Sequence, residues 1–199
     1  MSRYATIVIP DISGFTNFIA TTELSLSAGV LCELLNELIG VTDQRYTVAE
    51  VEGDAVLFYA PDKAIPVPDL LNYAQRAFNH FHTYLATLLP RLPEGPVRQA
   101  AANLTVKFIC HYGEFVEINI RNFKKPVGLE IVTAHRLLKN QVPSNEYLLI
   151  TKKCWQANAG GNQLPQELDF THHSENLDKI GNTPYYWKAL QKTNLVTST

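Results

Sequence analysis

The chain has 199 residues, of which 46% are hydrophobic and 18% charged, so it can bury a sizeable core. Seventeen basic residues stand against nineteen acidic ones without a long run of one sign, which argues against a nucleic-acid-binding arm or a basic membrane-surface patch. We expect one domain over residues 1–190 and a polar C-terminal tail over residues 191–199.

The sequence shows no sign of export or of a membrane anchor. No apolar stretch approaches the length of a membrane span, and residues 1–30 lack the charged, apolar and cleavage segments of a secretory leader. The cysteines Cys32, Cys110 and Cys154 form no pair at metal-ligand spacing, and we expect buried thiols in a reducing compartment. The expected location is therefore cytoplasmic, with neither a membrane nor a nucleic acid as partner.

The first elements predicted are a buried strand, a helical region and a hairpin. Residues 4–10 are apolar enough for a central strand. Residues 14–40 have helical spacing of their apolar side chains, and Gly29 is the expected break between two helices. Residues 46–52 and 55–60 alternate as strands around Gly53 and Asp54, which predicts a hairpin.

The second half predicts a long helix and further strands. A helix over residues 70–89 follows a proline-rich loop, and strands over residues 104–110 and 115–120 form a second hairpin around residues 111–114. Other predicted elements are a helix at 131–140, strands at 147–151 and 185–190, and a loop at 158–165. This order predicts an α+β, ferredoxin-like sandwich, whose mixed, mostly antiparallel sheet carries helices on one face.

Two carboxylates are predicted to meet on this framework. Asp11 ends the first strand and Asp54 lies in the first hairpin, so pairing of these strands brings them together. With the amide-rich turn of residues 13–16, they could hold Mg²⁺ and a phosphate group. Without an ion, we expect one carboxyl to have a raised pKa or to borrow a nearby lysine. The alternative is that both aspartates only satisfy turn amides.

Several short motifs, taken in order, resemble one known family. They are Pro10-Asp11-Ile12-Ser13-Gly14-Phe15-Thr16, Leu34-Leu35-Asn36, Gly53-Asp54, His111-Tyr112-Gly113 and Ala134-His135-Arg136-Leu137, followed by the closing hairpin of residues 179–187. From about residue 4 to residue 151 the chain resembles the class III nucleotidyl cyclases, the adenylyl and guanylyl cyclases, as a divergent stand-alone member.

The resemblance implies a homodimer whose two interfacial sites each bind a nucleoside triphosphate and two divalent ions, Mg²⁺ or Mn²⁺. Asp11 and Asp54 match the metal carboxylates, the Ile12 carbonyl matches a backbone ligand, and Arg136 matches a catalytic arginine. The family's triphosphate lysine falls on Ile180, with Lys179 beside it. The expected phosphate-binding residues are therefore Ser13, Gly14, Phe15, Thr16 and Lys179.

Other positions depart from the family pattern. Glu50 matches the base-reading glutamate of guanylyl cyclases, whereas Lys125 matches neither the adenylyl nor the guanylyl residue at the second base-reading position. Val132 replaces the family's transition-state asparagine and can donate no hydrogen bond. We expect Glu50 and Lys125 to face one another as a salt bridge that partly closes the base pocket.

Three functions remain open. The favoured one is a cyclase-like signalling domain that binds a divalent metal and a nucleotide, with cyclase activity weak or lost. The alternative is an active purine nucleotide cyclase that makes cGMP from GTP or cAMP from ATP. The second alternative is a phosphoryl-transfer enzyme of the diguanylate cyclase type, although Gly53-Asp54 lacks the doubled glycine and following acid of that family.

Overall fold

A computed structural model of the chain describes residues 1–159 and 168–192. Most of the predicted loop at 158–165 and of the predicted tail at 191–199 lies outside the described residues. The strands are β1 (Arg3–Ser13), β2 (Thr47–Glu52), β3 (Ala55–Pro61), β4 (Thr105–Ile120), β5 (Phe123–Val127), β6 (Tyr147–Thr151), β7 (Thr171–Leu177) and β8 (Gly181–Ala189). The helices are α1 (Phe15–Thr21), α2 (Leu24–Gly40), α3 (Val67–Leu88), α4 (Pro96–Ala102), α5 (Leu129–Arg136) and α6 (Lys152–Ala159), with 3-10 turns at Leu89–Arg91 and Leu137–Lys139.

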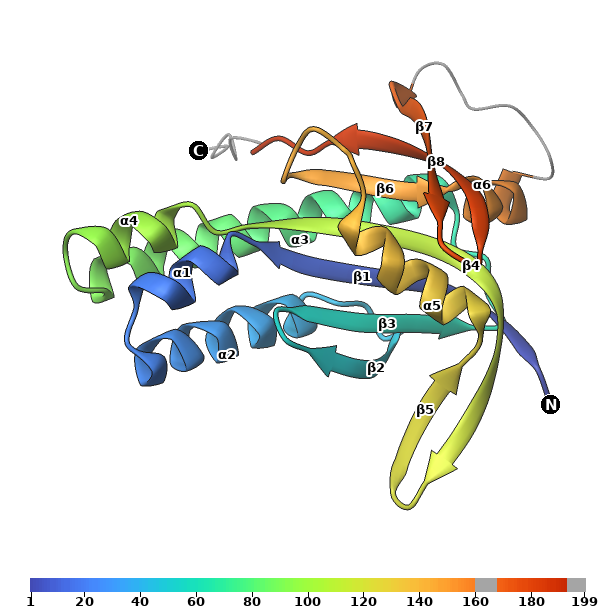
Figure 1. Cartoon of the computed structure of the whole chain (residues 1–199), viewed down its shortest axis with the longest axis horizontal. Coiled ribbons are helices and arrows are strands. Elements are labelled where there is room, and N and C mark those ends of the chain that lie inside the picture. Colours follow the sequence, from blue (N-terminus) through green and yellow to red (C-terminus); the bar gives the residue numbers. More distant parts are fainter. Residues whose placement is uncertain (160–167, 193–199) are drawn as a thin grey trace, which may run out of the picture.

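One eight-stranded sheet organises the molecule (Figure 1). Its order is β2-β3-β1-β4-β6-β8-β7, and β5 pairs with the far end of β4. The pairing of β4 with β6 is parallel, and the other pairs of described strands are antiparallel. The predicted α+β class, with a mixed and mostly antiparallel sheet, is therefore confirmed.

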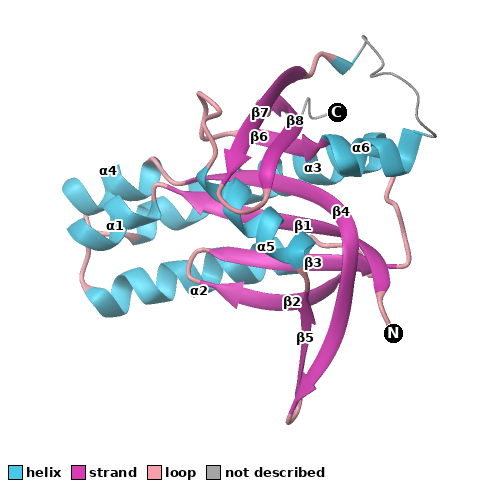
Figure 2. Ribbon diagram, turned by 45° about the vertical axis from the view of Figure 1, so that its right-hand side comes forward, coloured by secondary structure: helices cyan, strands magenta, loops and turns pink. Residues whose placement is uncertain are grey.

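The sheet is covered on both faces, and each face has its own hydrophobic core. Along β1, Val8 and Ile12 pack with α1, α2 and α3, whereas Ile7 and Ile9 face the side of α5. Successive side chains of a strand point to opposite faces, so β1 contributes to both cores. Figure 2 shows α5 in front of the sheet and α3 behind it. The expectation that the helices lie on one face was wrong, because α5 also has an apolar side to bury.

The helical region after β1 breaks at a different place from the one predicted. Residues 22 and 23 separate α1 from α2, and the Glu23 side chain accepts a hydrogen bond from the Ser25 amide at 3.3 Å. Gly29, the expected break, lies inside α2. A side chain that caps the first turn thus marks the start of this helix, because it satisfies an amide that has no partner within the helix. Strand β1 also runs two residues past Asp11.

The predicted second hairpin was wrong, because β4 continues unbroken through residues 111–114. The chain turns instead at Arg121 and Asn122, between β4 and β5. Gly113 does not form a turn; it leaves room for a neighbour, because a Cβ atom there would overlap the Glu130 side chain. Sequence analysis did not predict α4, β5, α6 or β7, and it expected Cys32 to be buried, whereas its side chain is exposed.

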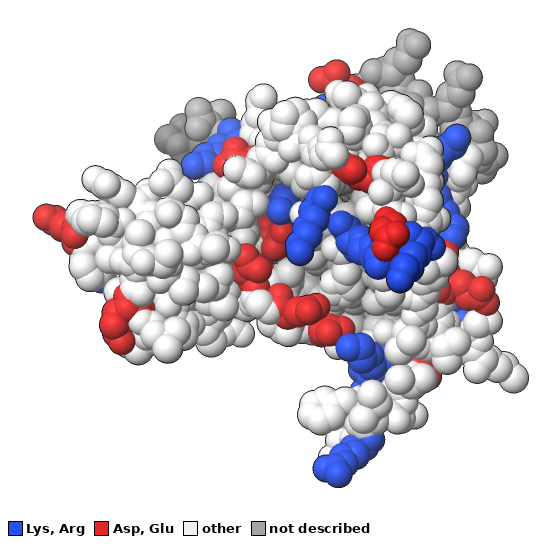
Figure 3. All heavy atoms as spheres, viewed as in Figure 1, with Lys and Arg blue, Asp and Glu red and all other residues white. Residues whose placement is uncertain are grey.

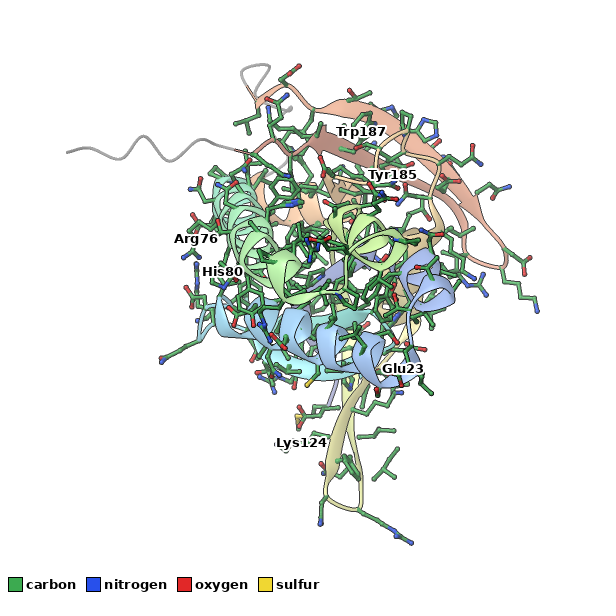
Figure 4. All side chains as sticks on the ribbon, turned by 90° about the vertical axis from the view of Figure 1, so that its left-hand side faces the viewer. Glu23, Arg76, His80, Lys124, Tyr185 and Trp187 are labelled. Atoms are coloured by element: carbon green, nitrogen blue, oxygen red, sulfur yellow. The ribbon has the colours of Figure 1, made fainter. Side chains whose placement is uncertain are left out.

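The hairpin of β4 and β5 projects away from the body of the molecule (Figure 1). Figure 4 shows Lys124 on this hairpin, well away from Tyr185 and Trp187 on the far part of the sheet. Among the described residues, no helix is long and apolar enough to cross a membrane.

Candidate functional site

Asp11 and Asp54 come together where β1 runs beside the β2–β3 hairpin. Asp11 lies opposite Ala55 in the strand register, and the Ile12 amide donates a hydrogen bond to the Asp54 carbonyl oxygen at 3.0 Å. Both aspartates line a cleft of about 340 Å³, together with Glu52, Ala55, His135, Leu138 and Lys139. The cleft lies on the α5 face, where acidic and basic side chains gather (Figure 3). Pairing of neighbouring strands therefore brings the two carboxylates together, as the sequence predicts.

Sequence analysis missed Lys107, which lies opposite Asp11 on β4. Its Nζ atom is 2.9 Å from Asp11 Oδ2, and the two side chains are only 17% and 13% exposed. The signal was present in the sequence, because Lys107 is an isolated charge in an otherwise apolar strand. A charge in such a position requires a partner of opposite sign.

The two aspartates differ in their electrostatic surroundings. Burial raises the pKa of Asp54, and the negative charge of Asp11 raises it further, while Lys107 opposes this change. Asp11, in turn, is paired with the Lys107 ammonium. Both of the alternatives expected for two carboxyls without an ion therefore occur here, the raised pKa at Asp54 and the lysine partner at Asp11.

The donor atoms at the cleft suit a hard divalent cation. Asp11 and Asp54 supply carboxylate oxygens, which Mg²⁺ and Mn²⁺ prefer. Within the described parts of the chain, no third His, Cys, Asp or Glu completes a metal-binding group with them. Two carboxylates are nevertheless sufficient for Mg²⁺, which usually keeps several waters and takes further oxygens from a bound phosphate. These residues therefore fit the ion that the resemblance implies.

The turn after β1 has one unusual feature at each of its first two residues. The Ser13 hydroxyl is buried without a hydrogen-bond partner. Gly14 has a φ of 88°, and a Cβ atom there would come within 3.0 Å of the Asn103 carbonyl oxygen. Phe15 is buried in the core and Thr16 is exposed at the start of α1. The Phe15 side chain is therefore committed to the core, and Phe15 could take part in the predicted phosphate contact only through its backbone.

The predicted base-reading residues face one another. Lys125 Nζ on β5 lies 3.3 Å from Glu50 Oε1 on β2, and both side chains are partly exposed. The expectation that they form a salt bridge is confirmed. The β4–β5 hairpin positions Lys125 here, although sequence analysis did not predict β5.

Arg136 and Lys179 lie together, but away from the aspartates. Arg136 ends α5, and its guanidinium donates a hydrogen bond to the Asp178 carbonyl in the turn between β7 and β8. Lys179 is exposed in the same turn with a φ of 60°. As far as the described residues show, neither lines the cleft of Asp11 and Asp54. Val132 is exposed on α5 and offers no polar side-chain atom.

A buried polar cluster holds the beginning of α5 against the sheet. His111 on β4 is a core histidine, with only 2% of it exposed. Its Nε2 atom is 2.6 Å from Glu130 Oε2 on α5, and its Nδ1 atom is 2.8 Å from Thr151 Oγ1 on β6. Lys153 on α6 forms an ion pair with the other oxygen of Glu130. This cluster holds the beginning of α5 in place, and the end of α5 carries His135, which lines the cleft.

Sequence comparisons match the chain to proteins without an assigned function. A family model described as "Protein of unknown function (DUF2652)" matches residues 31–147. The uncharacterized protein Rv2561/Rv2562 of Mycobacterium tuberculosis (strain ATCC 25618 / H37Rv) is 28% identical over 123 residues, which are 61% of this chain and 57% of that protein. The match thus spans little more than half of that relative.

Structure comparisons find nucleotidyl cyclase domains. The adenylyl cyclase CyaB from P. aeruginosa has a TM-score of 0.66 at 14% identity, covering 96% of this chain and 97% of that one. The catalytic core of a rhodopsin-guanylyl cyclase with converted specificity, in complex with ATPαS, gives 0.63 at 15% identity, covering 96% and 99%. The guanylate cyclase domain of RhGC from Catenaria anguillulae, in complex with GTP, gives 0.59 at 18% identity, covering 96% and 100%. These likenesses confirm the predicted cyclase fold.

Proposed function

Because the chain belongs to the DUF2652 family and has the fold of a nucleotidyl cyclase domain, we propose that it binds a divalent metal ion and a nucleotide, with cyclase turnover weak or lost. The observation that carries this proposal is the convergence of Asp11 and Asp54 at one cleft, with Lys107 paired to Asp11. A pair of carboxylates and a cation suit a metal ion and the phosphates it accompanies.

In this proposal Asp11 and Asp54 would hold Mg²⁺ or Mn²⁺, which would supply positive charge beside the phosphate groups. Lys107 and Lys139 add positive charge beside them. The backbone amides after Ser13 are the proposed phosphate donors. Two of the structures that share the fold contain a nucleotide, ATPαS in one and GTP in the other, which supports a nucleotide as the ligand.

Two features favour weak or absent turnover. Val132 has no hydrogen-bond donor at the position where the cyclases carry an asparagine, and loss of one transition-state donor typically costs about 10² to 10³ in rate. Glu50 and Lys125 already satisfy one another. Reading a base would require opening this pair, at a cost of up to about 1 kcal/mol, the usual worth of a partly exposed ion pair.

A homodimer completes the proposal. Arg136 and Lys179 lie outside the cleft of their own chain, so they would serve the cleft of a second copy. The projecting hairpin and the start of α5 expose an unusual number of apolar side chains, which a second copy would cover. These side chains are Val116, Ile118, Ile120, Phe123, Val127, Leu129 and Val132.

Metal-dependent nucleotide binding tests the proposal most directly. We expect calorimetry with Mn²⁺ and GTP or ATP to show binding by the wild type, and Asp54→Asn to lose it. Asp62→Asn is a matched control, because Asp62 is an exposed aspartate near the other end of β1. Absence of Mn²⁺-dependent binding of any nucleoside triphosphate by the wild type would contradict the proposal.

A measurement of cyclase turnover distinguishes the proposed function from that of an active purine nucleotide cyclase. The wild type is incubated with Mn²⁺ and each triphosphate, and the products are analysed by mass spectrometry. We expect little cyclic nucleotide from the wild type, and a gain when Val132→Asn is combined with Glu50→Lys and Lys125→Asp. Fast, base-selective cyclisation by the wild type would establish the alternative function.

A further inference from the structure

We infer that Lys107 is the counter-ion of Asp11 until an anionic ligand replaces Asp11 as its partner. Metal and phosphate would then bind cooperatively. The inference rests on the proposed function, since it concerns how the same cleft takes up its ligands. It assigns to Lys107 a role in setting metal affinity.

The strand register places Lys107 on Asp11. The two residues are directly opposite one another on β1 and β4, the central strands of the sheet. Both side chains are largely buried, and their charged atoms are 2.9 Å apart. A buried pair is screened little by salt, and removal of one partner leaves an uncompensated charge. Lys107 is therefore a fixed competitor for the oxygen atoms of Asp11.

The positive charge of Lys107 weakens the binding of a metal ion alone. Asp11, Asp54 and Lys107 together carry one net negative charge when both carboxyls are ionised. A divalent ion on the two carboxylates would bring two positive charges beside the Lys107 ammonium. Repulsion between the ion and this ammonium opposes such an arrangement unless another anion is present beside Lys107.

Neighbouring side chains do not remove this conflict. Glu52 lies on the same cleft, but its carboxylate is exposed and 3.7 Å from His135 Nδ1. Lys139 adds a further positive charge to the lining. Phosphate oxygens beside Lys107 would replace Asp11 as its partner and free both carboxylates for the ion. By thermodynamic linkage, the metal must then raise phosphate affinity by the same factor.

The first measurement is Mn²⁺ binding to the full chain without nucleotide. The electron paramagnetic resonance signal of free Mn²⁺ reports how much of the ion is bound. We expect Lys107→Gln to bind Mn²⁺ more tightly than the wild type, by a factor of about 5 to 150, the usual range of coupling. Lys107→Arg keeps the charge and should behave like the wild type. Asp11→Asn, combined with Lys107→Gln, should remove the gain.

The second measurement is the affinity for a fluorescent GTP analogue with and without Mn²⁺. We expect Mn²⁺ to increase wild-type affinity strongly, and to increase that of Lys107→Gln by a smaller factor. Equal Mn²⁺ affinity of wild type and Lys107→Gln would overturn the inference. Absence of any Mn²⁺ effect on nucleotide affinity in the wild type would overturn it as well, without need of a variant.

These outcomes keep the inference apart from the proposed function. If wild type and Lys107→Gln bind Mn²⁺ equally and both lose it with Asp54→Asn, the metal site stands and the counter-ion role fails. If neither protein binds Mn²⁺ or nucleotide, the proposed function itself fails. Thermal unfolding of each variant, and Lys107→Met as a second uncharged replacement, separate a binding effect from a loss of folding.

Discussion

The Glu130 carboxylate ties α5 to His111 on β4 and to Lys153 on α6. Its side chain is 16% exposed and is held by His111 and Lys153. The hydrogen bond with His111, followed by the contact with Lys153, lowers the pKa of Glu130 to about 2 against the opposing effect of burial. A carboxyl with a lowered pKa stabilises the fold above its ordinary pKa of about 4.3, and that contribution is lost as pH falls toward the folded value.

We therefore predict that Glu130→Gln lowers the free energy of unfolding by about 1 to 3 kcal/mol at pH 7, the scale of a hydrogen bond to a charged group. The difference from wild type should shrink as pH falls below about 4, because the wild type then loses the same interaction. Urea unfolding at pH 7 and at pH 3 measures both effects. Glu114→Gln, at an exposed position on β4, is the control and should change little. A penalty that is independent of pH would contradict this account.

At the scale of an element, two glycines near the start of the chain should respond in opposite ways to alanine. Gly29 lies inside α2, and nothing lies within 4 Å of an added Cβ atom, so Gly29→Ala should stabilise the protein by about 0.5 to 1 kcal/mol. Gly14 has a positive φ and touches the Asn103 carbonyl, so Gly14→Ala should destabilise it by about 1 to 3 kcal/mol. Thermal and urea unfolding of the two variants test this contrast. Destabilisation by Gly29→Ala would indicate that α2 needs a break there.

Elements with a clear apolar pattern could be predicted from the sequence, whereas boundaries inferred from glycines could not. Apolar periodicity predicted β1, β3, α3 and β6 closely, because their patterns follow directly from what each buries. Gly29 and Gly113 misled the prediction, because glycine also occurs inside helices and strands. At Gly113 the cause is the Glu130 side chain, which comes from a different element, α5.

The candidate site could be predicted only in part, because one of its contacts depends on the pairing of strands far apart in the sequence. Asp11 lies near the end of a predicted strand and Asp54 in a predicted hairpin, so the assumption that these strands pair was sufficient to bring them together. The pairing of Lys107 with Asp11 depends on the register between β1 and β4, which are separated by more than ninety residues. Knowledge of which strands neighbour one another in the sheet is needed before such a contact can be predicted.

At the scale of the whole molecule, we expect the projecting β4–β5 hairpin to form the contact between two copies of the chain. Phe123, at its tip, is 75% exposed, and Ile118 and Ile120 are exposed on the same hairpin. Apolar side chains gathered on a projecting element usually mark a contact with another protein. The proposed homodimer gives this surface a partner of the same kind, and a two-fold contact would form two equivalent sites.

We accordingly predict that the wild type is a dimer at micromolar concentration and that Phe123→Asp weakens dimerisation by roughly 30-fold, the effect of losing about 2 kcal/mol at an interface hot spot. The reason is that a carboxylate would have to be buried where an aromatic ring now supplies apolar area. Sedimentation velocity over a range of concentrations measures the dissociation constant. Leu24→Asp is the matched control, since Leu24 is 76% exposed at the start of α2, remote from the hairpin, and an acidic residue suits a helix N-terminus. If Phe123→Asp remains as dimeric as Leu24→Asp, the hairpin is not the contact surface. A monomeric wild type would remove the composite site altogether, because Arg136 and Lys179 would then have no second cleft to serve.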